Sequence, residues 1–153
     1  MDGEQSRRDA IEKLGWCCLG ASGVGAALYG YEFLSPNVLY EPSPIVNAGP
    51  SDQFPQLSVT PYTNASIYIV HGDRGLYALS ATCTHLGCHT AWVPELDLIA
   101  CPCHGSRFNR HGIKVAGPAP QPLPWLKLWI ADTGDVMVDR SIVLPSPKFV
   151  RVA

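Results

Sequence analysis

Two short segments of this 153-residue chain combine cysteine and histidine closely enough to bind a metal. The first reads CTHLGC at residues 83–88, and the second reads CPCHGS at residues 101–106. Each segment offers a cysteine and a histidine, and thiolate and imidazole are ligands that suit zinc, copper and iron–sulfur centres. Each also contains one further cysteine. The repetition predicts a single metal centre assembled from two loops.

Structural zinc is the main alternative, because two cysteines with two histidines are a common zinc ligand set. Zinc fingers pair cysteine with cysteine and histidine with histidine, whereas each segment here mixes the two residue types. The zinc interpretation also gives no role to Cys88 and Cys103, which stand at matching places beside the candidate ligands. A nucleophilic cysteine–histidine enzyme is favoured even less, because the pair occurs twice.

Taken together, the two segments resemble the paired motifs of the Rieske iron–sulfur proteins in quinol-oxidising cytochrome bc1 and b6f complexes. The resemblance implies a [2Fe–2S] cluster as the cofactor. It places Cys83 and Cys101 on one iron, and His85 and His104 on the other. Two histidines in place of two cysteines raise the reduction potential of such a cluster to roughly −150 to +300 mV.

The resemblance also assigns residues around the cluster. It implies a disulfide between Cys88 and Cys103 that joins the two loops. Ser106 matches a family serine that donates a hydrogen bond to a cluster sulfur, which favours the reduced cluster. The other cofactor-binding candidates lie in the first loop and in a proline-rich loop that covers the cluster in this family, and they are Leu86, Gly117 and Pro118.

One position departs from the pattern of high-potential family members. Two residues after the serine they usually carry a tyrosine whose hydroxyl donates to a ligand thiolate, and this chain has Phe108 there. Without that donor the negative charge of the reduced cluster is less stabilised, so a lower potential is expected. A lower potential fits menaquinol better than ubiquinol or plastoquinol.

The function implied by the resemblance is the iron–sulfur subunit of a bc-type quinol–cytochrome oxidoreductase, catalytic only within its complex. His85 and His104 are the candidate catalytic residues, because a ligand imidazole can take a quinol proton while the cluster takes one electron. The implied partners are a membrane quinol, a cytochrome b-type membrane subunit, and a c-type cytochrome or plastocyanin-type acceptor. The alternative is the Rieske electron-transfer subunit of a periplasmic molybdenum oxidase.

An apolar segment, residues 14–34, is expected to anchor the protein in a membrane. Glu32 is its only charged residue, and as a helix it would span roughly 31 Å, about the thickness of a bilayer core. The basic residues within positions 1–13 place that end in the cytoplasm. The following domain then lies on the periplasmic or lumenal side of a prokaryotic cytoplasmic or thylakoid-type membrane, crossed once. Arg7 and Arg8 resemble the start of a twin-arginine export signal.

Beyond the anchor, turn residues and β-branched residues dominate. Residues 35–50 contain four prolines and predict a semi-rigid hinge linker. Residues 51–153 are expected to form one small antiparallel Rieske [2Fe–2S] domain, so that the fold class is all-β with an N-terminal transmembrane helix. Strands are predicted at 66–70, 76–80, 90–93, 98–100, 106–108, 113–116, 126–130 and 136–138.

The bulk composition narrows the function classes further. A hydrophobic content of 46% is ordinary for a folded protein and argues against disorder. The formal net charge is −2, and basic residues do not cluster beyond the N-terminus, so no nucleic-acid partner is expected. The chain is also too short to hold the catalytic iron domain of a Rieske oxygenase beside the cluster domain.

Overall fold

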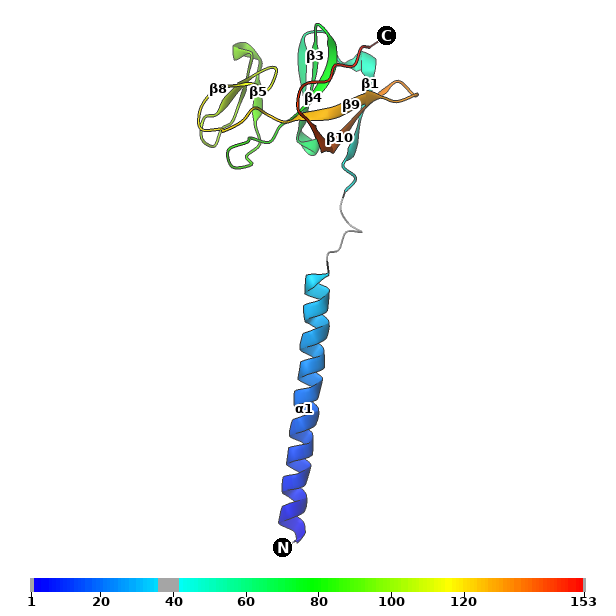
Figure 1. The fold of residues 1–153 in the computed structure, drawn as a ribbon, viewed down its shortest axis with the longest axis vertical. Coiled ribbons are helices and arrows are strands. Elements are labelled where there is room, and N and C mark those ends of the chain that lie inside the picture. The colour runs from blue at the N-terminus through cyan, green and yellow to red at the C-terminus, as the bar shows by residue number, and fades with distance from the viewer. Residues whose placement is uncertain (1, 36–41, 153) are drawn as a thin grey trace. The chain divides into compact units, whose positions relative to one another are not determined.

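The computed structural model describes residues 2–35 and 42–152. By its internal contacts the chain divides into two compact units, Met1–Pro42 and Ser43–Ala153. The first unit contains one long helix, and the second contains all the strands of the described residues (Figure 1).

The helix of the first unit, α1 (Asp2–Leu34), runs for 33 residues. The sequence predicts only its second part, but the polar residues before position 14 include good helix formers such as Glu, Gln and Arg. Within the described part of the chain, no helix is both long enough and apolar enough to cross a membrane. Five glycines between positions 14 and 34 lower the hydropathy of this stretch. The prediction that residues 14–34 are helical is confirmed. The prediction that this helix spans a membrane is not confirmed.

The second unit is built on a six-stranded antiparallel sheet. Its strand order is β1-β10-β9-β4-β3-β2, and sequence neighbours pair in β2–β3, β3–β4 and β9–β10. The bounds are β1 (Ile45–Pro50), β2 (Ser58–Tyr62), β3 (Ile67–Gly72), β4 (Gly75–Ser80), β9 (Trp125–Ile130) and β10 (Asp135–Leu144).

A smaller, four-stranded sheet is formed by the chain between β4 and β9, and Figure 1 shows β5 and β8 grouped apart from the larger sheet. Its order is β5-β6-β7-β8, and all its pairs are antiparallel. The strands are β5 (Ala91–Val93), β6 (Leu98–Ala100), β7 (Arg107–Asn109) and β8 (Lys114–Ala116).

The described residues also contain three 3-10 turns, at η2 (Ser51–Gln53), η3 (Thr63–Ala65) and η4 (Pro94–Leu96).

All eight predicted strands are present, as β3 to β10, and the all-β antiparallel fold class is confirmed. Two further strands, β1 and β2, were not predicted. Both lie at the edges of the six-stranded sheet, and both contain a proline, Pro50 or Pro61. A proline lowers the strand signal of a sequence, yet an edge strand tolerates it because one side of its backbone needs no ladder hydrogen bond.

Strand β1 corrects the predicted linker. The hinge was expected to run through residue 50, but residues 45–50 pair with β10, with Ile45 opposite Asp139 and Val46 opposite Val138. The folded unit begins at Ser43 instead. Residues 36–41, which make up much of the predicted linker, lie outside the described residues.

Two clusters of buried side chains form the core of the second unit. One lies within the larger sheet and contains residues such as Ile69, Leu128 and Val138. The other joins Tyr77 and Leu79 of β4 to the side chains of the smaller sheet and its loops. That second cluster includes the cysteines of the predicted metal centre, so the loops are fixed to the main sheet by packing.

Candidate metal centre

The first cysteine–histidine loop, residues 83–88, is closed by its own backbone. The Cys83 amide donates to the Cys88 carbonyl across 2.8 Å, and the Gly87 amide donates back to the Cys83 carbonyl across 3.0 Å. Gly87 has φ +75°, a conformation that glycine adopts without steric cost. The turn therefore explains why glycine stands at this position.

The second loop, residues 101–106, repeats this arrangement. The Cys101 amide donates to the Ser106 carbonyl across 2.8 Å, and the Gly105 amide donates to the Cys101 carbonyl across 3.1 Å. Gly105 has φ +74°, close to the value at Gly87. The two segments are thus two copies of one turn, each presenting a cysteine at its start.

A disulfide joins the loops. Cys88 and Cys103 are bonded, with their Cα atoms 6.6 Å apart, which confirms the pairing implied by the family resemblance. Cys83 and Cys101 form no disulfide with any described residue and are only 2% and 3% exposed. Two buried thiols therefore remain available after the disulfide has formed.

The three sulfur atoms of Cys88, Cys101 and Cys103 lie within 4.8 Å of one another. Two of them belong to the disulfide and cannot act as thiolate ligands. Cys101 is the member of this group that retains a free thiol. The disulfide thus lies directly beside the candidate ligand and braces the loop that carries it.

The side chains of the two loop histidines lie next to each other. The ring centroids of His85 and His104 are 4.9 Å apart, with their planes at 85°. The Nδ1 atom of His85 is buried and has no hydrogen-bond partner among the described residues. A buried polar nitrogen without a partner is costly, and binding a metal would satisfy it. Two free thiols and two adjacent imidazoles fit the ligand set of a Rieske cluster.

A third segment, the proline-rich loop at residues 117–124, closes over the second cysteine–histidine loop. Gly117 has φ +89°, and a Cβ atom built there would lie 2.8 Å from the carbonyl oxygen of Gly105 and 2.8 Å from the amide nitrogen of Ser106. Only glycine allows this approach. Beyond it, the Ala119 amide donates to the Ser106 hydroxyl oxygen across 3.1 Å.

The remaining predicted site residues differ in burial. Phe108 is fully buried and belongs to the same core cluster as Cys83 and Cys101. Leu86 is 69% exposed, and Pro118 is exposed as well. Leu86 and Pro118 therefore belong to the outer surface of the loops, whereas Phe108 lies beneath them.

Two residues that support the loops were missed by the sequence analysis. Thr84 donates its hydroxyl to the Gln121 carbonyl across 2.7 Å, which ties the first loop to the proline-rich loop. The Tyr68 hydroxyl donates to the Thr90 carbonyl across 2.7 Å, at the end of the first loop. Burial raises the pKa of Tyr68, while the hydrogen bond with Thr90 opposes that shift. Both bonds join segments that are distant in the sequence, so no local sequence pattern predicts them.

Comparison with known proteins agrees with this geometry. The family model described as the Rieske [2Fe-2S] domain matches residues 46–128. The chain belongs to the Rieske iron–sulfur protein family. The matched range contains both cysteine–histidine loops, the proline-rich loop and most of the two sheets. A [2Fe–2S] cluster is therefore the cofactor of this Rieske domain.

The chain is similar to several Rieske proteins of known kind. It is 35% identical to the cytochrome b6-f complex iron-sulfur subunit of Chlorobaculum tepidum over 142 residues, covering 86% of this chain and 74% of that protein. It is 42% identical to the chloroplastic counterpart of Fritillaria agrestis over 71 residues, covering 45% of this chain and 31% of that protein. A solved quaternary ammonium Rieske monooxygenase is 18% identical with a TM-score of 0.50, covering 64% of this chain and 31% of that chain, and shares the fold alone.

Proposed function

We propose that this Rieske protein is the iron–sulfur subunit of a cytochrome b6f- or bc-type quinol oxidoreductase. The observation that carries the proposal is the contact between the His85 and His104 rings, in the two loops that also contain the two buried free thiols. The similarity to the Chlorobaculum tepidum subunit along most of both chains supports it. As such a subunit, the chain takes part in catalysis only together with its membrane partners.

The proposed ligands are one cysteine and one histidine from each loop. Cys83 and Cys101 supply the thiolates for one iron, and His85 and His104 supply the imidazoles for the other. The buried, unsatisfied Nδ1 of His85 supports this assignment for the first loop. When bound, the cluster supplies one-electron chemistry at a potential of roughly −150 to +300 mV.

The two histidines also have a proposed role in moving a proton. A neutral imidazole that binds metal through one nitrogen carries its hydrogen on the second nitrogen, which becomes a hydrogen-bond acceptor once that hydrogen is lost. His104 is exposed and His85 is half-buried, so a quinol hydroxyl can reach this edge of the domain. In the proposal, the second ring nitrogen carries no hydrogen when the quinol arrives, and it accepts that hydroxyl's proton as the quinol is oxidised.

The finer features of the reaction are part of the proposal too. Phe108 offers no hydroxyl to the cluster, which favours a low-potential quinol such as menaquinol. The electron then passes to a c-type haem or a plastocyanin-type acceptor, and the other quinol electron passes to a cytochrome b-type subunit.

We also propose that residues 14–34 of α1 anchor the chain in the membrane. Large apolar side chains on this helix, Trp16, Leu19, Val24 and Leu28 among them, are exposed in the chain. A lipid environment would cover them. In the proposal, the Rieske domain lies on the periplasmic or lumenal side, and residues 35–42 form the hinge.

The test is to purify the chain from its native membrane in a mild detergent and to identify the subunits that accompany it. A cytochrome b-type subunit and quinol-dependent reduction of a c-type cytochrome are expected. A molybdopterin protein in place of cytochrome b would contradict the proposal. Metal analysis of the same sample should give equal amounts of iron and acid-labile sulfide, whereas zinc without sulfide would contradict the ligand assignment.

A further inference from the structure

The β3–β4 hairpin and the C-terminal tail line an open pocket of about 580 Å³. This volume lies within the range of small-molecule sites, roughly 300–1,000 Å³. No residue of the cysteine–histidine loops or of the proline-rich loop lines it. Its lining residues are Gln56, His71, Asp73, Arg74, Gly75, Phe149, Arg151 and Val152.

The walls of this pocket are held together by backbone pairing. The Leu76 amide donates to the Val150 carbonyl across 2.8 Å, and the Val150 amide donates to the Leu76 carbonyl across 2.9 Å. Gly75 has φ +123°, and a Cβ atom built there would lie 2.8 Å from the carbonyl carbon of Val150. Glycine therefore lets the tail approach the hairpin this closely, and the pocket is formed before any ligand arrives.

Two guanidinium groups, one from the hairpin and one from the tail, give the pocket its positive charge. Arg74 extends from the hairpin turn and Arg151 from the tail. The Arg110–Asp97 pair is the sole ion pair of the described residues, so neither of these arginines has a carboxylate oxygen within 4.0 Å. Asp73 is the only carboxylate residue in the lining, so with His71 neutral the lining carries two positive charges and one negative charge, a net charge of +1.

Two of the polar groups are already oriented. The guanidinium carbon of Arg74 stands 3.9 Å from the centroid of the Phe149 ring, a cation–π contact that restrains the planar group. The Nδ1 atom of His71 lies 2.8 Å from the Phe54 carbonyl oxygen. A carbonyl can only accept, so Nδ1 carries the hydrogen and Nε2 remains for a ligand.

We propose that this pocket binds a small phosphorylated molecule through Arg74 and Arg151. Guanidinium groups present paired N–H donors that match the oxygens of a phosphate, and two of them can share its charge. Asp73 provides an acceptor for a hydroxyl on the same ligand. A ligand held by both arginines would also bridge the hairpin and the tail, and so strengthen the pairing between Leu76 and Val150.

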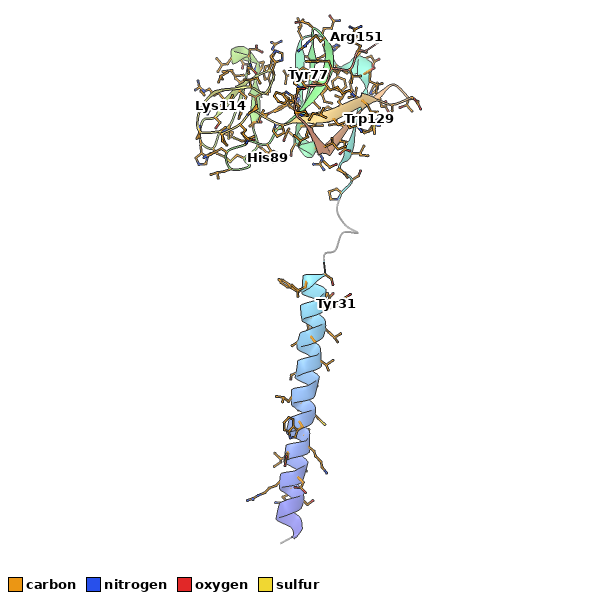
Figure 2. All side chains as sticks on the ribbon, viewed as in Figure 1. Tyr31, Tyr77, His89, Lys114, Trp129 and Arg151 are labelled. Carbon is orange, nitrogen blue, oxygen red and sulfur yellow. A yellow bond between two sulfur atoms is a disulfide. The ribbon has the colours of Figure 1, made fainter. Side chains whose placement is uncertain are left out.

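The test uses the full cluster-containing chain in detergent, titrated calorimetrically with pyrophosphate at constant ionic strength. Saturable one-to-one binding is expected, and Arg151→Gln and Arg74→Gln should each weaken it roughly tenfold or more. Lys114→Gln is the matched control, because this exposed cation lies on β8, apart from Arg151 (Figure 2). Arg74→Gln also removes the contact with the Phe149 ring and could disturb the fold of the pocket. Arg151 is exposed and makes no side-chain hydrogen bond to the described residues, so Arg151→Gln tests ligand binding without that complication.

The outcomes separate a specific site from general charge attraction. Binding that does not saturate, or that Lys114→Gln weakens as much as Arg151→Gln does, would overturn the proposal. Vesicles of phosphatidylglycerol, compared with vesicles of phosphatidylcholine, test a lipid headgroup as the source of the phosphate. Arginine-dependent binding to phosphatidylglycerol vesicles without any binding of pyrophosphate would also overturn a small-molecule site.

Discussion

Ser106 receives a hydrogen bond from the amide of Ala119 across 3.1 Å, at a position with no solvent exposure. The bond uses the hydroxyl oxygen as an acceptor, which leaves the hydroxyl hydrogen available as a donor. Ser106 closes the backbone turn that begins at Cys101. The serine therefore holds the proline-rich loop and keeps its hydroxyl hydrogen free to donate.

Replacing this serine should lower the reduction potential. In Ser106→Ala the donor is lost, so the negative charge of the reduced cluster is less stabilised. A decrease of some tens of millivolts is expected, where about 59 mV is a tenfold change in the equilibrium constant of a one-electron couple. Voltammetry would measure it, with the exposed Ser141→Ala as the control. An unchanged potential in a correctly folded variant would show that Ser106 makes no such bond.

Phe108→Tyr should shift the potential in the opposite direction. Phe108 is fully buried in the core cluster that contains Cys83 and Cys101. We therefore expect a phenolic hydroxyl added there to reach a sulfur of one of these proposed ligands. A hydrogen bond to a charged acceptor is worth about 1.5–3 kcal/mol, and only the difference between oxidised and reduced cluster changes the potential. A rise of some tens of millivolts is therefore expected.

The matched control is Phe54→Tyr, which adds the same hydroxyl to a buried phenylalanine of the other core cluster. This control should leave the potential unchanged. If Phe108→Tyr also leaves it unchanged while the visible spectrum stays normal, the argument for menaquinol loses its support.

Removal of the disulfide should weaken the hold on the cluster. Cys88 and Cys103 are 15 residues apart, and closing a loop of that length stabilises a folded protein by about 3 kcal/mol in the chain-entropy model. Cys88→Ser should therefore lower the urea concentration at which the visible absorption is lost, with the exposed Cys17→Ser as the control. Equal urea resistance in the two variants would show that packing alone fixes the loops.

The sequence was most informative where chemistry depends on local spacing. The two motifs identified the cysteines and histidines of both loops, because each turn uses five or six consecutive residues and a glycine at a fixed place. The same motifs could not reveal that Thr84 bonds to Gln121, 37 residues further along the chain. Such bonds depend on tertiary placement, which leaves no periodic signal.

Strands, too, could be predicted where the signal is local and not where it depends on long-range pairing. The hairpin of β3 and β4 combines β-branched residues with a clear turn, and it was predicted within two residues at each end. The edge strands β1 and β2 were missed because Pro50 and Pro61 read as loop residues. Their place at the sheet edge follows from long-range pairing with β10 and β3, which the local sequence does not encode.

The contact between the two sheets suggests a last prediction. The Tyr77 hydroxyl, on β4, lies 3.1 Å from the Arg110 carbonyl oxygen and 2.9 Å from Nδ1 of His111, both in the turn between β7 and β8. Burial raises the pKa of Tyr77 to about 12, although the positive charges of Arg110 and Arg74 oppose the shift. The neutral phenol therefore serves as a hydrogen-bonded link between the sheets.

This link should weaken in alkali. In the unfolded chain Tyr77 ionises near pH 10, whereas in the folded chain it keeps its proton to about pH 12. Its stabilising effect is thus complete below pH 10 and is lost as the pH rises through 12, by an amount of order 2 kcal/mol.

Tyr77→Phe should lower the free energy of unfolding by about 1 kcal/mol near neutral pH and reduce its decline between pH 10 and 12. Denaturant unfolding at a series of pH values would measure both effects, with the exposed Tyr31→Phe (Figure 2) as the control. Identical alkaline slopes for wild type and Tyr77→Phe would contradict the prediction.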